Sequence, residues 1–305
     1  SITKRFQILE KWFNKKMNIN KQLISIKDRI DKRSKDSRSS YLKKVKFSSE
    51  QTKSARKNMG CSNIAHAFAS CDKAQQDQGA NGGSVIGIVS AYNDMLSAHA
   101  PLKDYPDIIK KSSEKRDAIA RVAGGVPAMC DGITQGEPGM ELSLFSRDVI
   151  ALSTAVAFSH NVFDAGICLG VCDKIVPGLV IGALSFGHLP IAMLPAGPMP
   201  TGISNEEKSN NRKKYASGEI DRSALISSEQ SAYHTSGTCT FYGTANTNQL
   251  IMEVMGLQLP SSSFFQPNSH ERQLLIDKTV ECVLKLKDKD KKMGEMLDAR
   301  SWVNA

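Results

Sequence analysis

The sequence predicts an α/β fold in which a parallel, doubly wound sheet lies between two layers of helices, preceded by a basic helical segment. Two observations support this prediction. Short apolar or β-branched runs alternate with longer helical patterns through residues 84–305, as in chains that build parallel sheets from helical crossovers. Polar loops follow these runs, and open α/β sheets bind ligands at that carboxyl edge of their strands.

The first 60 residues differ from the rest of the chain in charge. They hold 18 Lys/Arg and 5 Asp/Glu, a net charge of +13, whereas the remainder holds 22 and 26, a net charge of −4. The overall charge of +9 therefore belongs to the N-terminal segment. Aromatic residues make up 6% of the chain and form no stacking platform among the basic residues, so we expect no nucleic-acid partner.

The chain is expected to have three parts. Residues 1–16 look foreign to the rest, and we expect them to be a non-native upstream extension, with a transit peptide as the alternative. Residues 17–83 are expected to form a helical N-terminal segment. Within it, 20–46 suggest basic amphipathic helices, 61–68 a helix of small residues, and 72–83 an exposed loop.

The remaining part, residues 84–305, is expected to be the α/β domain. It opens with a β-branched run, Val85 to Ser90, which predicts a buried strand. Further strands are expected at 165–170 and 190–194, and helices at 105–121, 147–160, 179–186, 204–217, 223–233, 244–255 and 270–286.

The loop at residues 170–178 carries the most distinctive chemistry. Cys172, Asp173 and Lys174 are consecutive, so a thiol, a carboxylate and an amine lie between two apolar runs, the second of which follows Pro177. This arrangement is typical of a buried strand, a polar loop and a helix. Alternatively, the cysteine fills core and the aspartate caps the helix.

Similar loops recur along the chain and together resemble a known family. The motifs are Asn93-Asp94, Cys130-Asp131-Gly132, Cys172-Asp173-Lys174 with Pro177-Gly178, and Gly237-Thr238-Cys239 with Thr244-Ala245-Asn246-Thr247. In this order they resemble the dihydroxy-acid/sugar-acid dehydratase family, from about Met17 to the end of the chain. Residues 293–305 resemble the interior of the family sequence, so we expect an N-terminal portion without the family's C-terminal domain.

The resemblance implies a hydro-lyase. It is greatest to the branch that converts 6-phospho-D-gluconate to 2-dehydro-3-deoxy-6-phospho-D-gluconate in the Entner–Doudoroff pathway, with an iron–sulfur cluster as Lewis acid on the C3 hydroxyl. It further implies a [4Fe–4S] rather than a [2Fe–2S] cluster, Mg²⁺ or Mn²⁺, a sugar-acid phosphate substrate, and a homodimer when full length. The alternatives are another dihydroxy-acid or sugar-acid dehydratase, or an inactive truncated metal-binding remnant.

The resemblance assigns Cys172 and Cys239 as cluster ligands. Related dehydratases carry a cysteine where this chain has Ala98, and lack one at the position of Cys130. We therefore expect Cys130 to be the third ligand, with Cys61 as the alternative. The other cysteines are expected to be structural: Cys71, Cys168 and Cys282. No CxxC pair occurs, which argues against a zinc ribbon or a ferredoxin-type site.

The resemblance also implies a divalent-metal site. Asp131 and Asp173 are the expected oxygen ligands, and in relatives the position of Lys174 can be carbamylated to give a further oxygen ligand. Each aspartate has a simpler alternative: Asp131 as part of an Asp-Gly turn and Asp173 as a helix cap.

Substrate contacts are expected from polar residues near the same loops: Asn93, Asp94, Ser97, His99 and Arg147. His99 could instead be a surface residue, and Arg147 could pair with an acid rather than bind a carboxylate or phosphate. The general base implied by the resemblance, a serine alkoxide, belongs to motifs absent from this chain.

Compartment signals are few. No apolar run approaches the roughly 20 residues needed to cross a bilayer, and no secretory signal pattern opens the chain. Reduced thiols suit the cytoplasm. We therefore expect a cytoplasmic protein without a membrane partner.

Overall fold

A computed structural model describes residues 20–239 and 243–305, so the predicted extension at 1–16 lies outside the described residues. The described part contains one sheet of four parallel strands in the order β2-β1-β3-β4. The strands are β1 Ser84–Ser90, β2 Ala118–Gly125, β3 Ala165–Leu169 and β4 Ile191–Leu194. From β1 the chain goes to one side for β2 and returns to the other side for β3, so the topological switch point lies between β1 and β3.

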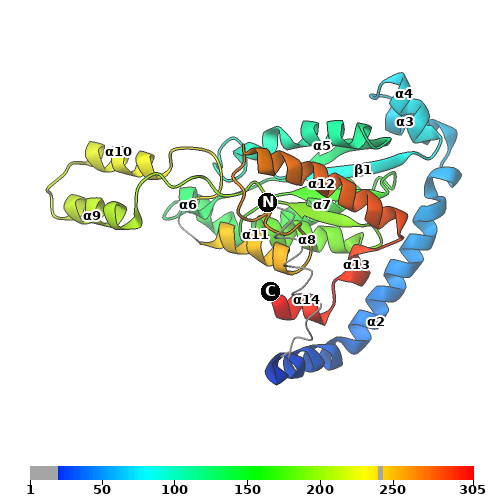
Figure 1. The fold of residues 1–305 in the computed structure, drawn as a ribbon, viewed down its shortest axis with the longest axis horizontal. Helices are drawn as coiled ribbons and strands as arrows, with labels where there is room; N and C mark the ends of the chain where they lie inside the picture. Colours follow the sequence, from blue (N-terminus) through cyan, green and yellow to red (C-terminus); the bar gives the residue numbers. More distant parts are fainter. Residues whose placement is uncertain (1–19, 240–242) are drawn as a thin grey trace, which may run out of the picture.

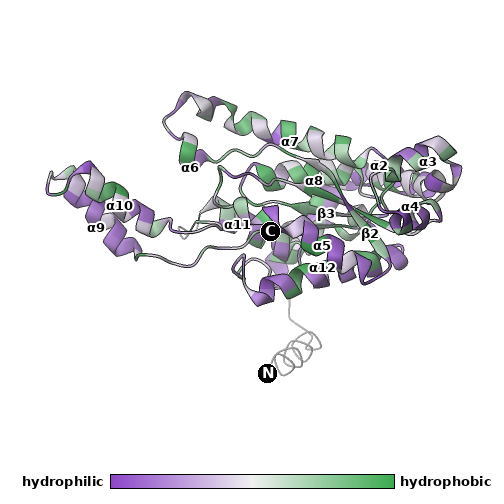
Figure 2. Cartoon of the chain, turned by 90° about the horizontal axis from the view of Figure 1, so that it is seen from above, coloured by the Kyte–Doolittle hydropathy of each residue, from purple (hydrophilic) through white to green (hydrophobic). Residues whose placement is uncertain are grey.

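Helices cover both faces of this sheet. Figure 2 shows α5 and α12 on one face and α7 and α8 on the other. Their bounds are α5 Tyr105–Glu114, α7 Ser143–Phe158, α8 Ile175–Ser185 and α12 His270–Asp288. The predicted three-layer, doubly wound architecture is therefore confirmed, and the fully buried apolar side chains of β1 and β3 form its centre.

Three of the shorter described elements lie between strands, and the other five follow β4. They are η1 Ala100–Lys103, α6 Asp131–Thr134, η2 Pro138–Leu142, α9 Asn205–Ala216, α10 Arg222–Ala232, α11 Thr244–Val254, α13 Met293–Met296 and α14 Ala299–Asn304. Figure 1 shows α9 and α10 projecting as a hairpin from the end of the sheet domain near α6 and α11. None of the helices in the described ranges is long and apolar enough to span a membrane.

The N-terminal segment is a single long helix followed by two short ones. The helices are α2 Lys21–Asn58, α3 Cys61–Phe68 and α4 Lys73–Ala80. Figure 1 shows α2 running along the side of the sheet domain past α13 and α14. The Tyr41 hydroxyl donates to the Leu184 carbonyl at 2.9 Å, and Arg56 pairs with Asp164 at 2.5 Å. These contacts attach α2 to the α/β domain.

Two predictions of local structure are wrong. The expected loop at 72–83 contains α4, because the Asp72 side chain accepts from the Gln75 amide at 2.9 Å and caps the helix. The expected helix at 105–121 ends with α5 at Glu114 and continues as β2. Asp117, at φ 52°, reverses the chain, and the following small and β-branched residues pair in parallel with β1.

Close packing of α7 on α8 requires a glycine at position 182. A Cβ there would lie 2.5 Å from the Thr154 Cβ and 2.7 Å from the Ala151 carbonyl oxygen. We expect Gly182→Ala to lower the free energy of unfolding by about 1–2 kcal/mol, because overpacking outweighs the gain in helix propensity. Denaturant unfolding would measure this, with Ser185→Ala at the exposed end of α8 as the control. An unchanged or raised stability of Gly182→Ala would contradict the packing argument.

Candidate functional site

The predicted site residues lie at the carboxyl edge of the sheet. Asn93 and Asp94 follow β1, Cys130 follows β2, Cys172 follows β3, and Cys239 lies beyond β4 and the α9–α10 hairpin. This edge includes the switch point between β1 and β3, where open α/β sheets bind ligands. The fold therefore brings together motifs that are far apart in the sequence.

Cys172 has an unusual backbone conformation. Its φ is 76°, in the left-handed region that residues with a Cβ rarely adopt, and it is only 8% exposed. Burial raises the pKa of its thiol well above the ordinary value, and the charges of Cys130, Asp173 and Cys239 raise it further. Cys130 and Cys239 therefore both lie within electrostatic reach of the Cys172 thiol.

These thiols do not form a closed site for a single ion. In the part of the chain that the structure describes, no three His, Cys, Asp or Glu side chains are grouped to hold one metal ion. A cluster of several iron atoms is larger than one ion and keeps its thiolate ligands farther apart. Three thiols on three loops are the donor set that a cluster held by three thiolates would use.

Lys174 joins the two predicted metal-binding aspartates. Its ammonium donates to Oδ2 of Asp131 and, at 2.9 Å, to Oδ2 of Asp173, while the Ser143 hydroxyl donates to Oδ1 of Asp131 at 2.6 Å. Lys174 is only 8% exposed. The structure thus places a cation between these carboxylates, and we call Asp131, Asp173 and Lys174 the charged triad.

Two members of the charged triad, Asp131 and Lys174, have pKa values shifted toward their charged forms. Burial raises the pKa of Asp131, but hydrogen bonds from Lys174 and Ser143 outweigh it and leave the pKa below its ordinary value. Burial lowers the pKa of Lys174, but hydrogen bonds to Asp131 and Asp173 leave it above its ordinary value. Two neighbouring carboxyl groups are suitable sources of oxygen ligands for Mg²⁺ or Mn²⁺.

His99 is fully buried, so the alternative of a surface histidine is wrong. Its Nε2 lies 3.2 Å from the carbonyl oxygen and 3.3 Å from the amide nitrogen of Val171. Burial lowers the pKa of His99 to about 4, so the ring is neutral near pH 7. The ring holds the backbone next to Cys172, and a direct substrate contact by His99 stays a prediction.

The other predicted substrate contacts lie nearer the surface. Asp94 is exposed and accepts from the Tyr92 hydroxyl at 2.6 Å, while the Asn93 side chain accepts from the Met95 amide at 2.7 Å. Arg147, near the start of α7, lies 3.7 Å from Asp148, as the alternative of an acidic partner predicts. Ser97 is exposed, and its carbonyl accepts from the Gly237 amide at 2.7 Å. That bond joins the loop after β1 to the Cys239 loop.

Sequence reasoning missed two supporting groups. Ser143, which orients Asp131, lies 12 residues away on another helix, and no motif marks it. Asn246 belongs to a recognised motif but had no assigned role. Its amide donates to the Cys239 carbonyl at 3.0 Å, and its Oδ1 accepts from the Thr238 hydroxyl at 2.6 Å. The start of α11 therefore supports the Cys239 loop.

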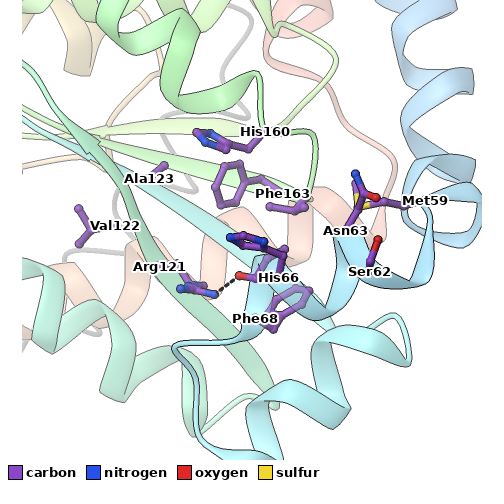
Figure 3. Close-up of a pocket in the computed structure, with 12 residues that line it drawn as sticks. Met59, Ser62, Asn63, His66, Phe68, Arg121, Val122, Ala123, His160 and Phe163 are labelled. Atoms are coloured by element: carbon purple, nitrogen blue, oxygen red, sulfur yellow. Dashed lines mark hydrogen bonds between the residues drawn. The ribbon is translucent and has the colours of Figure 1, made fainter.

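A cavity of about 530 Å³ lies away from the predicted site. It opens between α3, the edge strand β2 and the segment before β3, and Figure 3 shows His66, Arg121 and His160 in its wall. Arg121 donates to the Ala67 carbonyl at 2.5 Å and to the Ser70 hydroxyl at 2.6 Å, so it fastens α3 to β2. None of the predicted site residues lines this cavity.

Comparison with known proteins identifies a family. The family described as "Dihydroxy-acid/6-phosphogluconate dehydratase N-terminal" matches residues 84–305. The phosphogluconate dehydratase of Escherichia coli K12 is 49% identical over 295 residues, covering 94% of this chain and 48% of that protein. The phosphogluconate dehydratase of Helicobacter pylori strain 26695 is 51% identical over 284 residues, covering 93% and 46%. The dihydroxy-acid dehydratase of Aquifex aeolicus is 34% identical over 219 residues, covering 70% and 39%. The chain thus spans about half the length of the phosphogluconate dehydratases, 48% and 46% in these two cases.

Proposed function

This chain belongs to the dihydroxy-acid/6-phosphogluconate dehydratase family, and we propose that it is the cluster-binding part of an enzyme that dehydrates 6-phospho-D-gluconate to 2-dehydro-3-deoxy-6-phospho-D-gluconate. The observation that carries the proposal is the convergence of three cysteine loops and the charged triad at one edge of the sheet. The identity of 49% to a phosphogluconate dehydratase, against 34% to a dihydroxy-acid dehydratase, supports this substrate over its relatives.

We assign Cys130, Cys172 and Cys239 to an iron–sulfur cluster, and Asp131 and Asp173 to a divalent cation. When bound, these groups would supply Lewis acids for the departing C3 hydroxyl and for the substrate carboxylate. We favour a [4Fe–4S] cluster. Residues 84–305 would be the domain that holds both groups, with residues 17–83 as its helical support.

The chain's own residues would hold this site in place. His99 supports the backbone at Val171 and so favours the left-handed conformation of Cys172. Ser143 fixes one oxygen of Asp131, leaving the other toward Lys174. Lys174 pairs with both carboxylates, and Asp131 and Asp173 would hold the divalent cation. Lys174 would become a further oxygen ligand if its neutral amine added CO2 and released a proton to solvent, which forms a carbamate.

Removal of the C2 proton needs a base within hydrogen-bond reach, roughly 2.6–3.2 Å from the proton's parent atom. In our assignment the cysteines and aspartates are occupied as ligands, and His99 is buried against Val171. We therefore propose that the base comes from outside these residues. The chain alone should then turn over at least about 10²-fold more slowly than complete relatives, the lower end of the usual contribution of general-base catalysis.

Substrate binding tests the proposed function directly. The chain would be reconstituted anaerobically with iron and sulfide, and its visible spectrum followed during titration with 6-phospho-D-gluconate or 2,3-dihydroxyisovalerate. We expect a saturable change with the phosphorylated sugar acid alone. A response to dihydroxyisovalerate alone would indicate a related dehydratase. Failure to bind any cluster would indicate a remnant without this function.

The third cysteine ligand has its own test. Cys130 immediately precedes α6 at the carboxyl edge of the sheet, and its charge raises the pKa of the Cys172 thiol. Cys61 instead is the first residue of α3. The next two residues, Ser62 and Asn63, line the cavity together with Phe163, which precedes the amino end of β3.

We therefore expect Cys130→Ser to lose most of the reconstituted iron and Cys61→Ser to keep it. Iron and sulfide assays per chain would measure this difference. The reverse pattern would make Cys61 the ligand and would contradict the assignment of Cys130.

A further inference from the structure

Arg272, near the start of α12, is a fully buried cation that donates only to backbone carbonyls. Its guanidinium bonds to Pro195 at 3.0 Å, Ser262 at 2.7 Å and Phe265 at 2.5 Å, and its side chain is 0% exposed. No ion pair found among residues 20–239 and 243–305 includes it. Glu253 supplies only a longer-range attraction, and burying a charge without a direct ion pair is costly, so its three bonds need a structural reason.

Tyr105, the first residue of α5, reaches the same two loops. Its buried hydroxyl lies 2.9 Å from the Ala196 carbonyl oxygen and 3.3 Å from that of Pro267. We call Arg272 and Tyr105 the brace. It ties the segment that leaves β4, at 195–197, to the loop at 262–267.

Gly197 connects the brace to the Cys239 loop. Its φ is 94°, and a Cβ there would lie 2.0 Å from the Phe265 carbonyl oxygen and 2.3 Å from Nη2 of Arg272. The Gly197 carbonyl accepts from the Thr238 amide at 2.9 Å, and the Thr238 carbonyl accepts from the Met199 amide at 2.9 Å. These two bonds set Thr238 in a fixed register beside the segment that leaves β4.

We propose that Arg272 and Tyr105 are positioning residues that hold Cys239 at the edge of the sheet, in the place where it can ligate the cluster. The contacts run from the brace to Gly197, from Gly197 to Thr238, and along the backbone to Cys239. A second attachment, from Asn246 of α11 to the Cys239 carbonyl, leads back to the same loop, because Gln249 donates to Oδ1 of Asn246 and to the Ser263 carbonyl, both at 3.0 Å. The inference rests on the proposed role of Cys239 as a ligand.

The geometry also explains why an arginine occupies this position. Its planar fork reaches carbonyls of three residues in two loops at once, whereas a lysine ammonium is a compact donor on a flexible stem. Arg272→Lys would keep the charge and lose the fork. Tyr105→Phe would keep the ring in the core and remove only the hydroxyl, so it is the milder variant.

The test compares Arg272→Lys and Tyr105→Phe with wild type and with Arg116→Gln. Arg116 pairs with Asp277 of α12 at a partly exposed position, so it controls for loosening of α12. In cluster-free protein, alkylation rates of Cys239 and Cys71 would be followed by peptide mass spectrometry. In reconstituted protein, the rate of iron loss to a chelator would be followed by visible absorbance.

We expect Tyr105→Phe to raise both the Cys239 alkylation rate and the iron-loss rate by about two- to tenfold, as loss of one hydrogen bond implies, and Arg272→Lys to raise them more. Cys71 alkylation and the Arg116→Gln protein should match wild type. Unchanged Cys239 alkylation in Tyr105→Phe, or an equal rise at Cys71, would overturn the proposal. Absence of a cluster in wild type would refute the proposed function, while the alkylation measurement would still decide on the brace.

Discussion

Cys172→Ser is expected to abolish cluster binding by this chain. Cys172 is held at φ 76° in a buried loop between β3 and α8, within electrostatic reach of Cys130 and Cys239. Serine keeps the size of the side chain, but an alkoxide is a harder and far more basic ligand than the thiolates that hold iron–sulfur clusters. The brown chromophore and nearly all the bound iron should therefore disappear.

Anaerobic reconstitution followed by visible absorbance, iron and sulfide assays would measure this loss. Cys239→Ser should behave in the same way, whereas Cys71→Ser, beyond the end of α3, is the matched control and should retain full iron content. Circular dichroism would establish that each variant is folded. Full iron content in folded Cys172→Ser would rule out this cysteine as a ligand.

Lys174→Met is expected to cause a large loss of stability. The methionine would fill the space of the lysine stem but leave the carboxylates of Asp131 and Asp173 facing each other without a cation. Breaking a fully buried pair costs about 3–5 kcal/mol. The aspartate side chains are 34% and 31% exposed, which lets solvent screen the repulsion. We therefore expect the free energy of unfolding to fall by about 2–3 kcal/mol near neutral pH.

The pH dependence of this loss follows from the two shifted pKa values. The folded pKa of Asp131 lies below 3.8, so its stabilisation is present above pH 3.8 and is lost as the pH falls through the folded value. The folded pKa of Lys174 lies above 10.5, so its stabilisation is present below pH 10.5 and is lost as the pH rises through the folded value. The difference between wild type and Lys174→Met should be greatest between these limits.

Denaturant unfolding of metal-free protein across this pH range would test the prediction. The control is Lys73→Met, which breaks an exposed pair with Asp77 on α4 and should change stability by less than about 1 kcal/mol. If Lys174→Met were as stable as wild type at neutral pH, the charged triad would not be a stabilising unit. Under our assignment of a divalent cation to these two carboxylates, Mg²⁺ should restore part of the lost stability.

The sequence alone determined most of the strands and the chemistry of the loops. β1, β3 and β4 were predictable because each is an apolar run whose burial on both faces needs no knowledge of its neighbours. Cys172, Asp173 and Lys174 were recognisable because they are consecutive, and consecutive residues stay together in any fold. The family resemblance then linked this loop to Cys130 and Cys239.

Only the tertiary structure decided how the remaining parts meet. β2 has small residues that suit a helix equally well, and it is a strand because β1 offers its backbone partners. Lys174 reaches Asp131 across 43 positions, and Arg272 reaches Pro195 across 77. The free energy gained from such contacts depends on burial and on partners that come close only in the folded chain. No local sequence pattern therefore predicts that His99 is buried or that Arg272 braces the loop of Cys239.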